Sequence, residues 1–226
     1  MVTPRRRTIS QISDMVYDIH NFGVFVDTRE IFLTTSLEEH LENAMIDHTV
    51  ATTFVKNMAL LNSANDKPIL IHMITNGGDW NYGMAIYDAI YHSPAHVTVL
   101  AYAHARSMSS IIPQAADLRI MMPNAEFLIH HGEMAVDGTF TTAKYEVAWA
   151  DECDKRMVQI YAEKCINGPY FKKKNATLKV VTNWLEKQMA YKEQVYFSPQ
   201  DAVQYGFMDG ILGSPEFPTI DSLRCP

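Results

Sequence analysis

The order of apolar and polar positions along the chain predicts alternating strands and helices. Residues 30–34 form a short apolar run of strand length, and apolar side chains recur at helical spacing across residues 50–61. Two longer apolar runs follow at residues 69–74 and 97–103, and a helical pattern comes after each of them. Strands that alternate with helices are typical of an α/β fold with parallel strands, so we predict that fold class.

The second half of the chain continues this alternation and then changes character. Two short strands are predicted at residues 118–122 and 126–130. Residues 167–194 form a mixed stretch with some helical spacing, and a final helix is predicted at residues 200–205. Between these segments, one helix is predicted over about residues 141–165. That helix is too long for a simple crossover between neighbouring strands.

Composition adds that the chain is an ordinary globular protein. It has 226 residues, of which 47% are hydrophobic and 20% are charged, and this balance fits one domain with a full core. No internal repeat, low-complexity block or Pro/Gly-rich linker marks a second domain. The formal net charge of −7 argues against nucleic-acid binding, because phosphate neutralisation needs clustered Lys and Arg. We therefore expect no nucleic-acid partner.

Membrane, secretory and metal signals are missing from the pattern as well. No stretch approaches the roughly 18 apolar residues that a spanning helix needs. Basic residues 5–7 precede a polar segment rather than the apolar region of a signal peptide. Cys153, Cys165 and Cys225 have neither metal-ligand nor disulfide spacing, so free thiols are expected. We predict a cytoplasmic protein with no membrane partner and no metal site.

Candidate chemistry lies where three of the predicted strands end. Gly77-Gly78 follows the strand at residues 69–74, Ser107 follows the next strand, and His130 ends a later one. Ligands gather outside the carboxyl ends of strands in open α/β sheets. A serine hydroxyl becomes a useful nucleophile when a histidine, with a pKa of about 6.5, takes its proton.

The same residues supply the remaining parts of an acyl-transfer site. The developing oxyanion needs backbone N–H donors, and a Gly-Gly turn facing a helix N-terminus can provide them. The sequence therefore predicts Ser107 as nucleophile, His130 as general base, and the N–H groups of Gly78 and Met108 as the oxyanion hole. Each feature alone has an ordinary explanation, since a serine before a helix is usually an N-cap.

Several ordered motifs resemble a known family. Residues 77–88 (GGDWNYGMAIYD), 105–110 (ARSMSS) and 123–130 (PNAEFLIH) resemble, in order and in register, the signatures of the Clp protease proteolytic subunit. That family consists of serine peptidases with the crotonase-like fold. The resemblance extends over about residues 29–212 and assigns the family's nucleophile, base and oxyanion-hole donors to the residues already singled out.

The resemblance also implies an architecture. The expected fold is α/β and crotonase-like, with layered β-sheets, crossover helices and a protruding handle helix at about residues 141–165. Residues 134–139 correspond to the family's substrate-aligning strand. The implied division is an N-terminal segment at residues 1–28, which contributes axial-pore loops in the family, a peptidase domain at residues 29–213, and a tail at residues 214–226.

Assembly and partners follow from the same resemblance. Family members form two stacked heptameric rings, a tetradecamer, around a closed chamber, and the handle helix joins the rings face to face. They receive unfolded chains from an AAA+ ATP-driven unfoldase. By resemblance, this subunit hydrolyses peptide bonds of unfolded proteins or peptides inside such a chamber, without a metal or organic cofactor.

The chain departs from the family at the third member of the catalytic triad. Gln194 occupies the position of the family's aspartate, and Glu193 precedes it. The third residue orients the histidine and stabilises the imidazolium, and an amide can do only the first of these. Glu193 is therefore an alternative third member, and Glu186 and Asp201 are further acidic candidates.

Three functions remain open on the sequence. The first is an active serine endopeptidase. The second is a catalytically weak or inactive subunit that shapes a ring, which the replacement at Gln194 favours. The third is a crotonase-type acyl-CoA enzyme, and the pairing of Ser107 with His130 argues against it, because such enzymes usually rely on carboxylates.

Overall fold

The sheet at the centre of the molecule is assembled from strands that lie far apart in the sequence. The computed structural model describes residues 9–34 and 45–224. In these residues eight strands form one sheet in the order β1-β2-β3-β4-β5-β8, and β6 pairs with both β4 and β7. The strands are β1 (Val24–Phe25), β2 (Glu30–Thr34), β3 (Ile69–Thr75), β4 (Val97–Arg106), β5 (Leu118–Met121), β6 (Glu126–His130), β7 (Gln194–Phe197) and β8 (Gly210–Ile211).

Strand β4 explains how the sheet branches. Its first half pairs in parallel with β5 at residues 98–101, and its last residues pair in parallel with β6 at residues 104–106. Strand β7 then adds to β6 in antiparallel register. The carboxyl ends of β3, β4 and β6 therefore point the same way, as the sequence-based placement of the site requires.

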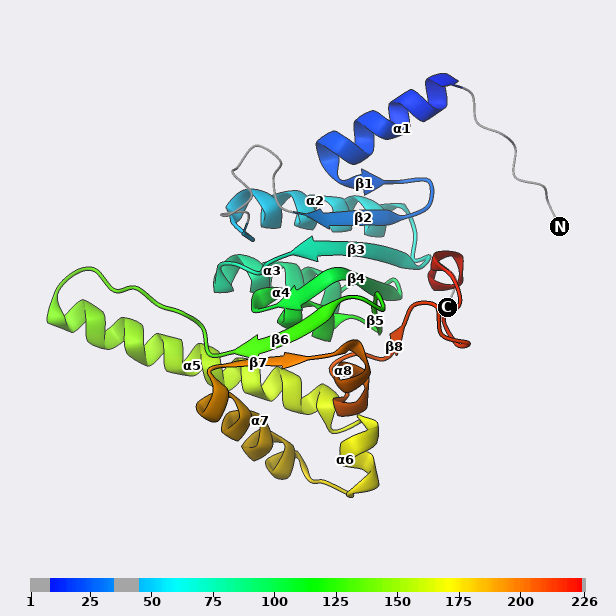
Figure 1. The fold of residues 1–226 in the computed structure, drawn as a ribbon. Coiled ribbons are helices and arrows are strands. Elements are labelled where there is room, and N and C mark those ends of the chain that lie inside the picture. Colours follow the sequence, from blue (N-terminus) through cyan, green and yellow to red (C-terminus); the bar gives the residue numbers. More distant parts are fainter. Residues whose placement is uncertain (1–8, 35–44, 225–226) are drawn as a thin grey trace.

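Helices cover the sheet and extend beyond it. Helices α2 and α3 lie together behind β2, β3 and β4, while α5, α7 and α8 pack near β6 and β7 (Figure 1). The helices are α1 (Ile9–Phe22), α2 (His48–Ala64), α3 (Trp80–Tyr91), α4 (Met108–Ile111), α5 (Phe140–Cys165), α6 (Pro169–Lys173), α7 (Leu178–Lys192) and α8 (Pro199–Tyr205), with short 3-10 turns at Ile112–Ala115 and Ile220–Leu223.

Helix α5 has a buried base and an exposed outer half. Its last turns carry the buried side chains, from Met157 to Cys165, whereas Phe140 is 86% exposed at the start. The outer half projects from the body of the molecule (Figure 1). The long helix predicted from the sequence is therefore present, and its length carries it past the sheet that its base covers.

A separate apolar cluster lies under the end of the chain. Leu70, Leu100 and Ile120 come from β3, β4 and β5, and Leu223 from the C-terminal 3-10 turn packs on them. These side chains are almost fully buried although they are not part of the main core. The segment that follows β8 thus covers apolar side chains of the sheet.

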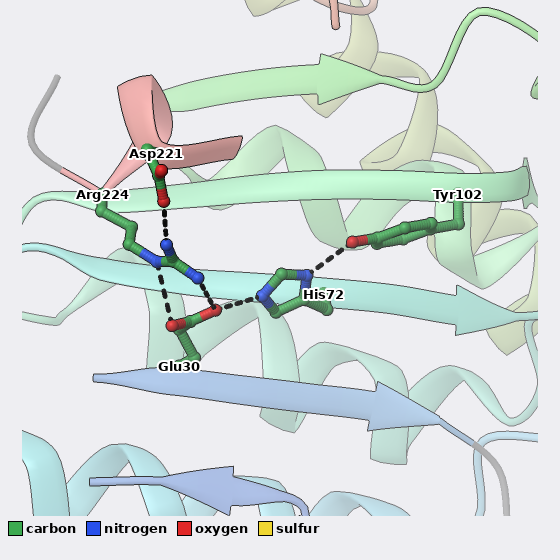
Figure 2. A network of polar contacts seen from close by, with 5 residues as sticks. All are labelled: Glu30, His72, Tyr102, Asp221 and Arg224. Carbon is green, nitrogen blue, oxygen red and sulfur yellow. Dashed lines mark hydrogen bonds and ion pairs between the residues drawn. The ribbon is translucent and has the colours of Figure 1, made fainter. Parts of the chain in front are cut away.

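A polar network fastens this C-terminal segment to the first strands (Figure 2). His72 Nε2 lies 2.7 Å from Glu30 Oε2, His72 Nδ1 lies 2.8 Å from the Tyr102 hydroxyl, and Arg224 Nε donates to Glu30 Oε1 at 3.0 Å. Arg224 also contacts Asp221. Burial alone raises the pKa of the Glu30 carboxyl, but hydrogen bonds from His72 and Arg224 outweigh burial and lower that pKa to about 2.

Some expectations about elements were wrong. Residues 134–139 form no strand, because no neighbouring strand of the described chain lies beside them and a strand needs a partner. Strand β4 continues to Arg106, past residue 103 where the predicted run ends, because its end pairs with β6. Strands β1, β7 and β8 and helix α1 were not predicted. Arg5–Arg7 and Cys225 lie outside the described residues.

Candidate active site

Ser107 occupies a strained turn between β4 and α4. Its backbone has φ 51° and ψ −128°, a region that costs roughly 1–3 kcal/mol for a residue with a side chain. It stands at the N-cap position of α4, yet its side chain makes no capping hydrogen bond. The ordinary explanation for a serine before a helix therefore does not hold, and the hydroxyl is free for another partner.

That partner is His130 at the end of β6. His130 Nε2 lies 2.8 Å from Ser107 Oγ, a distance typical of a hydrogen bond. Parallel pairing of β4 with β6 brings the two residues together, and Ser107 N donates to Leu128 O at 3.3 Å. Although 23 positions separate them in the chain, the pair that the sequence predicted is in contact.

The environment of His130 favours the neutral imidazole. Burial lowers its pKa, the nearby carboxylates of Glu133 and Asp154 raise it, and the net direction is downward. Nδ1 has no hydrogen-bond partner among the described residues. His130 can therefore accept a proton from Ser107, but no hydrogen bond at Nδ1 fixes the ring.

The Gly-Gly turn after β3 lies against the nucleophile turn. A Cβ on Gly77, where φ is 100°, would lie 2.8 Å from Ser107 Cβ and 3.0 Å from Met108 N. A Cβ on Gly78 would lie 2.4 Å from the backbone of Ile46, to which Gly78 is bridged. Only glycine fits at either position, so the backbone of the turn can approach the start of α4.

Two backbone donors remain near Ser107. In the described residues, neither the N–H of Gly78 nor that of Met108 donates to a protein acceptor. Met108 opens α4, and the two turns lie side by side, because a Cβ on Gly77 would come within 3.0 Å of Met108 N. The sequence singled out Gly78 and Met108 as donors but missed that Gly77 makes the closest approach.

Gln194 faces His130 across a strand pair but does not bond to it. Strands β6 and β7 place Gln194 directly opposite His130, so both side chains lie on one face of the sheet. The amide is exposed, and Gln194 Oε1 accepts a hydrogen bond from the Tyr196 hydroxyl at 3.1 Å. The register thus places a neutral amide opposite His130, at the residue that the resemblance equates with the family's aspartate.

The acidic alternatives considered from the sequence are occupied elsewhere. Glu193 is an exposed C-cap of α7 with φ 56°, and Glu186 lies on α7 beside a cavity of about 280 Å³ between α5 and α7. Asp201 accepts from Ser198 at the start of α8. None of the three contacts His130 or shifts its pKa.

Two other carboxylates act on the imidazole, and sequence reasoning missed both. Glu133 follows β6 closely, and Asp154 comes from α5; each raises the pKa of His130. Asp154 Oδ2 also lies 3.0 Å from Nδ1 of His131, the neighbour of His130. No motif spacing could have revealed Asp154, because its position depends on how α5 packs against the end of β6.

The described residues hold no group of three or more His, Cys, Asp or Glu side chains that could bind a metal ion. Within the same residues, no helix has both the length and the apolar content to cross a membrane. Cys153 and Cys165 are free thiols, as expected.

Comparison with known proteins decides the family. The sequence model of the Clp protease family matches residues 13–215. The chain belongs to the Clp protease family. The assignment made from the three motifs is therefore confirmed, and the matched region contains Ser107, His130 and Gln194.

Relatives within the Clp protease family are distant in sequence. The ATP-dependent Clp protease proteolytic subunit of Deinococcus radiodurans is 26% identical over 200 residues, covering 87% of this chain and 85% of the relative. Proteolytic subunit 3 of Streptomyces avermitilis is 27% identical over 169 residues, covering 74% of this chain and 70% of the relative.

The fold agrees with a solved Clp protease structure. A point mutant of ClpP1 from Listeria monocytogenes superposes with a TM-score of 0.66 at 20% sequence identity, covering 88% of this chain and 96% of that one. At this identity the likeness concerns the fold alone. The predicted α/β, ClpP-like fold is confirmed.

Proposed function

We propose that this chain is a serine endopeptidase subunit of a Clp-type barrel protease, with Ser107 as nucleophile and His130 as general base. The observation that carries the proposal is the 2.8 Å contact between Ser107 Oγ and His130 Nε2. Membership of the Clp protease family supplies the reaction class, hydrolysis of peptide bonds in unfolded proteins or peptides. The contact also counts against an acyl-CoA enzyme that relies on carboxylates.

The proposed chemistry has two stages. Ser107 Oγ attacks the carbonyl carbon while its proton passes to His130 Nε2, and the N–H groups of Gly78 and Met108 stabilise the oxyanion. His130 then gives the proton to the leaving amine, and water hydrolyses the acyl-enzyme by the same route. A lowered pKa keeps His130 neutral and able to accept the proton at neutral pH.

The third member differs from the usual carboxylate. Gln194 stands at the position of the family's aspartate and shares a sheet face with His130. Its amide is therefore proposed to orient the imidazole ring. The negative field at the imidazole comes instead from Glu133 and Asp154, which lie close enough to raise its pKa. This arrangement stabilises the imidazolium less than a hydrogen-bonded carboxylate does, so we expect a slow enzyme.

Assembly into rings is proposed from the exposed apolar side chains of α5. Phe140, Tyr145 and Trp149 are all more than half exposed on the projecting half of the helix. Large exposed apolar groups on one element mark a surface for association. We propose two stacked heptameric rings, fed by an AAA+ ATP-driven unfoldase at the axial pore and located in the cytoplasm; the relatives' names carry the words ATP-dependent.

Hydrolysis assays test this function directly. Wild-type protein is expected to cleave an unfolded protein such as casein and short fluorogenic peptides, and Ser107→Ala and His130→Ala should lose this activity. Ser63→Ala and His92→Ala, at surface positions of α2 and after α3, are matched controls that should cleave like the wild type. Equal residual cleavage in all four variants would refute the assignment.

A non-catalytic ring subunit is the second candidate. The observation that favours it is the lack of a hydrogen-bond partner for His130 Nδ1 among the described residues, next to the uncharged Gln194. If assembled wild-type protein cleaves nothing while Gln194→Asp does cleave, the structural function is correct and the active-enzyme proposal is wrong.

A further inference from the structure

A buried chain of hydrogen bonds connects the base of α5 to the nucleophile turn. The Tyr161 hydroxyl lies 2.7 Å from Ser110 Oγ, and Ser110 Oγ lies 2.6 Å from the Ser107 carbonyl oxygen. The Ser110 N–H donates to the same carbonyl at 2.9 Å. Tyr161 and Ser110 are both 0% exposed. The backbone carbonyl of Ser107, the proposed nucleophile, therefore accepts hydrogen bonds from both the hydroxyl and the N–H of Ser110.

The direction of the chain follows from the number of protons. Ser110 has one hydroxyl proton, and the carbonyl of Ser107 can only accept, so Ser110 donates to it. Tyr161 must then donate to Ser110 Oγ. Burial raises the pKa of the Tyr161 hydroxyl, so this donor keeps its proton. Donation by Tyr161 polarises the Ser110 hydroxyl and strengthens its bond to Ser107.

Holding the Ser107 carbonyl also sets the direction of the Met108 N–H. The two groups belong to one peptide unit, which is planar and trans, so the N–H points opposite to the C=O. The described structure contains no cis peptide bond. Rotation of this peptide plane is a real alternative, because Ser107 has the sparsely populated backbone angles φ 51° and ψ −128°.

We propose that Ser110 and Tyr161 are positioning residues that fix the peptide plane between Ser107 and Met108, so that the Met108 N–H points into the site. This inference rests on the proposed function, in which that N–H binds the oxyanion. Neither side chain touches the substrate. Their effect belongs to the transition state, because only then does negative charge develop on the substrate oxygen.

Kinetics of three variants test the inference. Ser110→Ala and Tyr161→Phe each remove one hydroxyl and are expected to lower kcat about tenfold with KM unchanged, less than the roughly 10²–10³-fold loss when an oxyanion donor is removed outright. Affinity for a peptide aldehyde, whose adduct carries the oxyanion, should fall by the same factor. The double variant should be no slower than Ser110→Ala, because Tyr161 acts only through Ser110.

Tyr102→Phe is the matched control. It likewise removes one hydroxyl that contacts a single side chain, here the part-buried Tyr102 hydroxyl on His72, in the network under the C-terminal segment (Figure 2). It should lower the thermal stability like Tyr161→Phe and leave kcat and aldehyde affinity unchanged. If it slowed the enzyme equally, or if the effects of Ser110→Ala and Tyr161→Phe multiplied in the double variant, the positioning assignment would be wrong.

Hydrogen exchange separates this inference from the proposed function. The amides of residues 107–111 are expected to exchange faster in Ser110→Ala and Tyr161→Phe than in the wild type, and at the wild-type rate in Tyr102→Phe. This readout needs no activity. An inactive wild type with faster exchange in both variants would refute only the peptidase proposal, whereas unchanged exchange in both variants would refute the positioning assignment.

Discussion

At the scale of single residues, the site combines a well-formed serine–histidine contact with an unusual environment around the histidine. His130 Nε2 contacts the Ser107 hydroxyl, and the neutral amide of Gln194 lies opposite His130 on the paired strand. Two carboxylates, Glu133 and Asp154, raise the pKa of His130 without a hydrogen bond to it. A base of this kind is neutral at physiological pH but gains little stabilisation once it is protonated. The rate and its pH dependence should both reflect that balance.

The pH dependence of kcat/KM is the first prediction. Because the pKa of His130 is lowered, kcat/KM should rise as pH increases through a midpoint below the ordinary value of about 6.5. Asp154→Asn removes a charge that raises this pKa, so its midpoint should lie lower still. Asp151→Asn, on the same helix but paired with Lys155, is the control. An upward shift in Asp154→Asn would contradict the electrostatic account.

Substitution of Gln194 is the second prediction. Gln194→Asp places a carboxylate opposite His130, where it stabilises the imidazolium, so kcat should increase at least about tenfold; loss of such a charge costs about 10⁴-fold in trypsin. The pH midpoint should rise at the same time, because a nearby negative charge raises the pKa of histidine. Gln200→Asp introduces the same charge on α8 and is the control. If kcat does not increase in Gln194→Asp, position 194 is not the third member of the site.

At the scale of elements, the bounds of some strands were predictable, whereas most contacts between distant elements were not. The apolar runs predicted β2 and β6 with their observed bounds, because each run is bordered by polar or turn residues. Strand β7 was missed because its alternation covers only Val195 and Phe197 as buried positions. The link from Tyr161 to Ser110 spans 51 positions and depends on packing, which periodicity does not report.

The ion pair that fastens the C-terminal segment gives the third prediction. Glu30 has a folded pKa of about 2, below its unfolded value, so its contribution to stability is full above about pH 4.5 and is lost as pH falls towards 2. Glu30→Gln should lower the free energy of unfolding by about 1–3 kcal/mol at pH 7, because Arg224 and His72 lose a charged partner.

Thermal or urea unfolding at several pH values measures this effect. The difference in unfolding free energy between wild type and Glu30→Gln should shrink steadily between about pH 4.5 and pH 2. Asp66→Asn, at an exposed position after α2, controls for general acid effects. A difference that stays constant over this range would show that the Glu30 carboxylate does not stabilise the fold.

At the scale of the whole molecule, the projecting half of α5 has no partner within the described part of the chain. This half projects beyond the body of the molecule (Figure 1). Its side chains include Phe140, Tyr145 and Trp149, each more than half exposed. A soluble monomer seldom exposes such a group of aromatic side chains on one helix. The proposed contact between two rings would cover them.

Charge placed on this surface is the fourth prediction. Tyr145→Asp with Trp149→Asp should break the contact between rings, because burying an unpaired carboxylate is costly, and the assembly should fall to about half its mass in sedimentation or mass photometry. Tyr191→Asp, at a position on α7 that is 87% exposed, is the control and should leave the mass unchanged. An unaltered mass in the double variant would place the contact between rings elsewhere.

The most direct test of the peptidase account is covalent labelling by a fluorophosphonate, with the modified residue mapped by peptide mass spectrometry. The account predicts a single adduct on Ser107 in the wild type at neutral pH, none in Ser107→Ala, and at least about a hundredfold slower labelling in His130→Ala, because a general base contributes about 10²–10⁴-fold. An adduct on another serine, or wild-type labelling that His130→Ala does not slow, would contradict it.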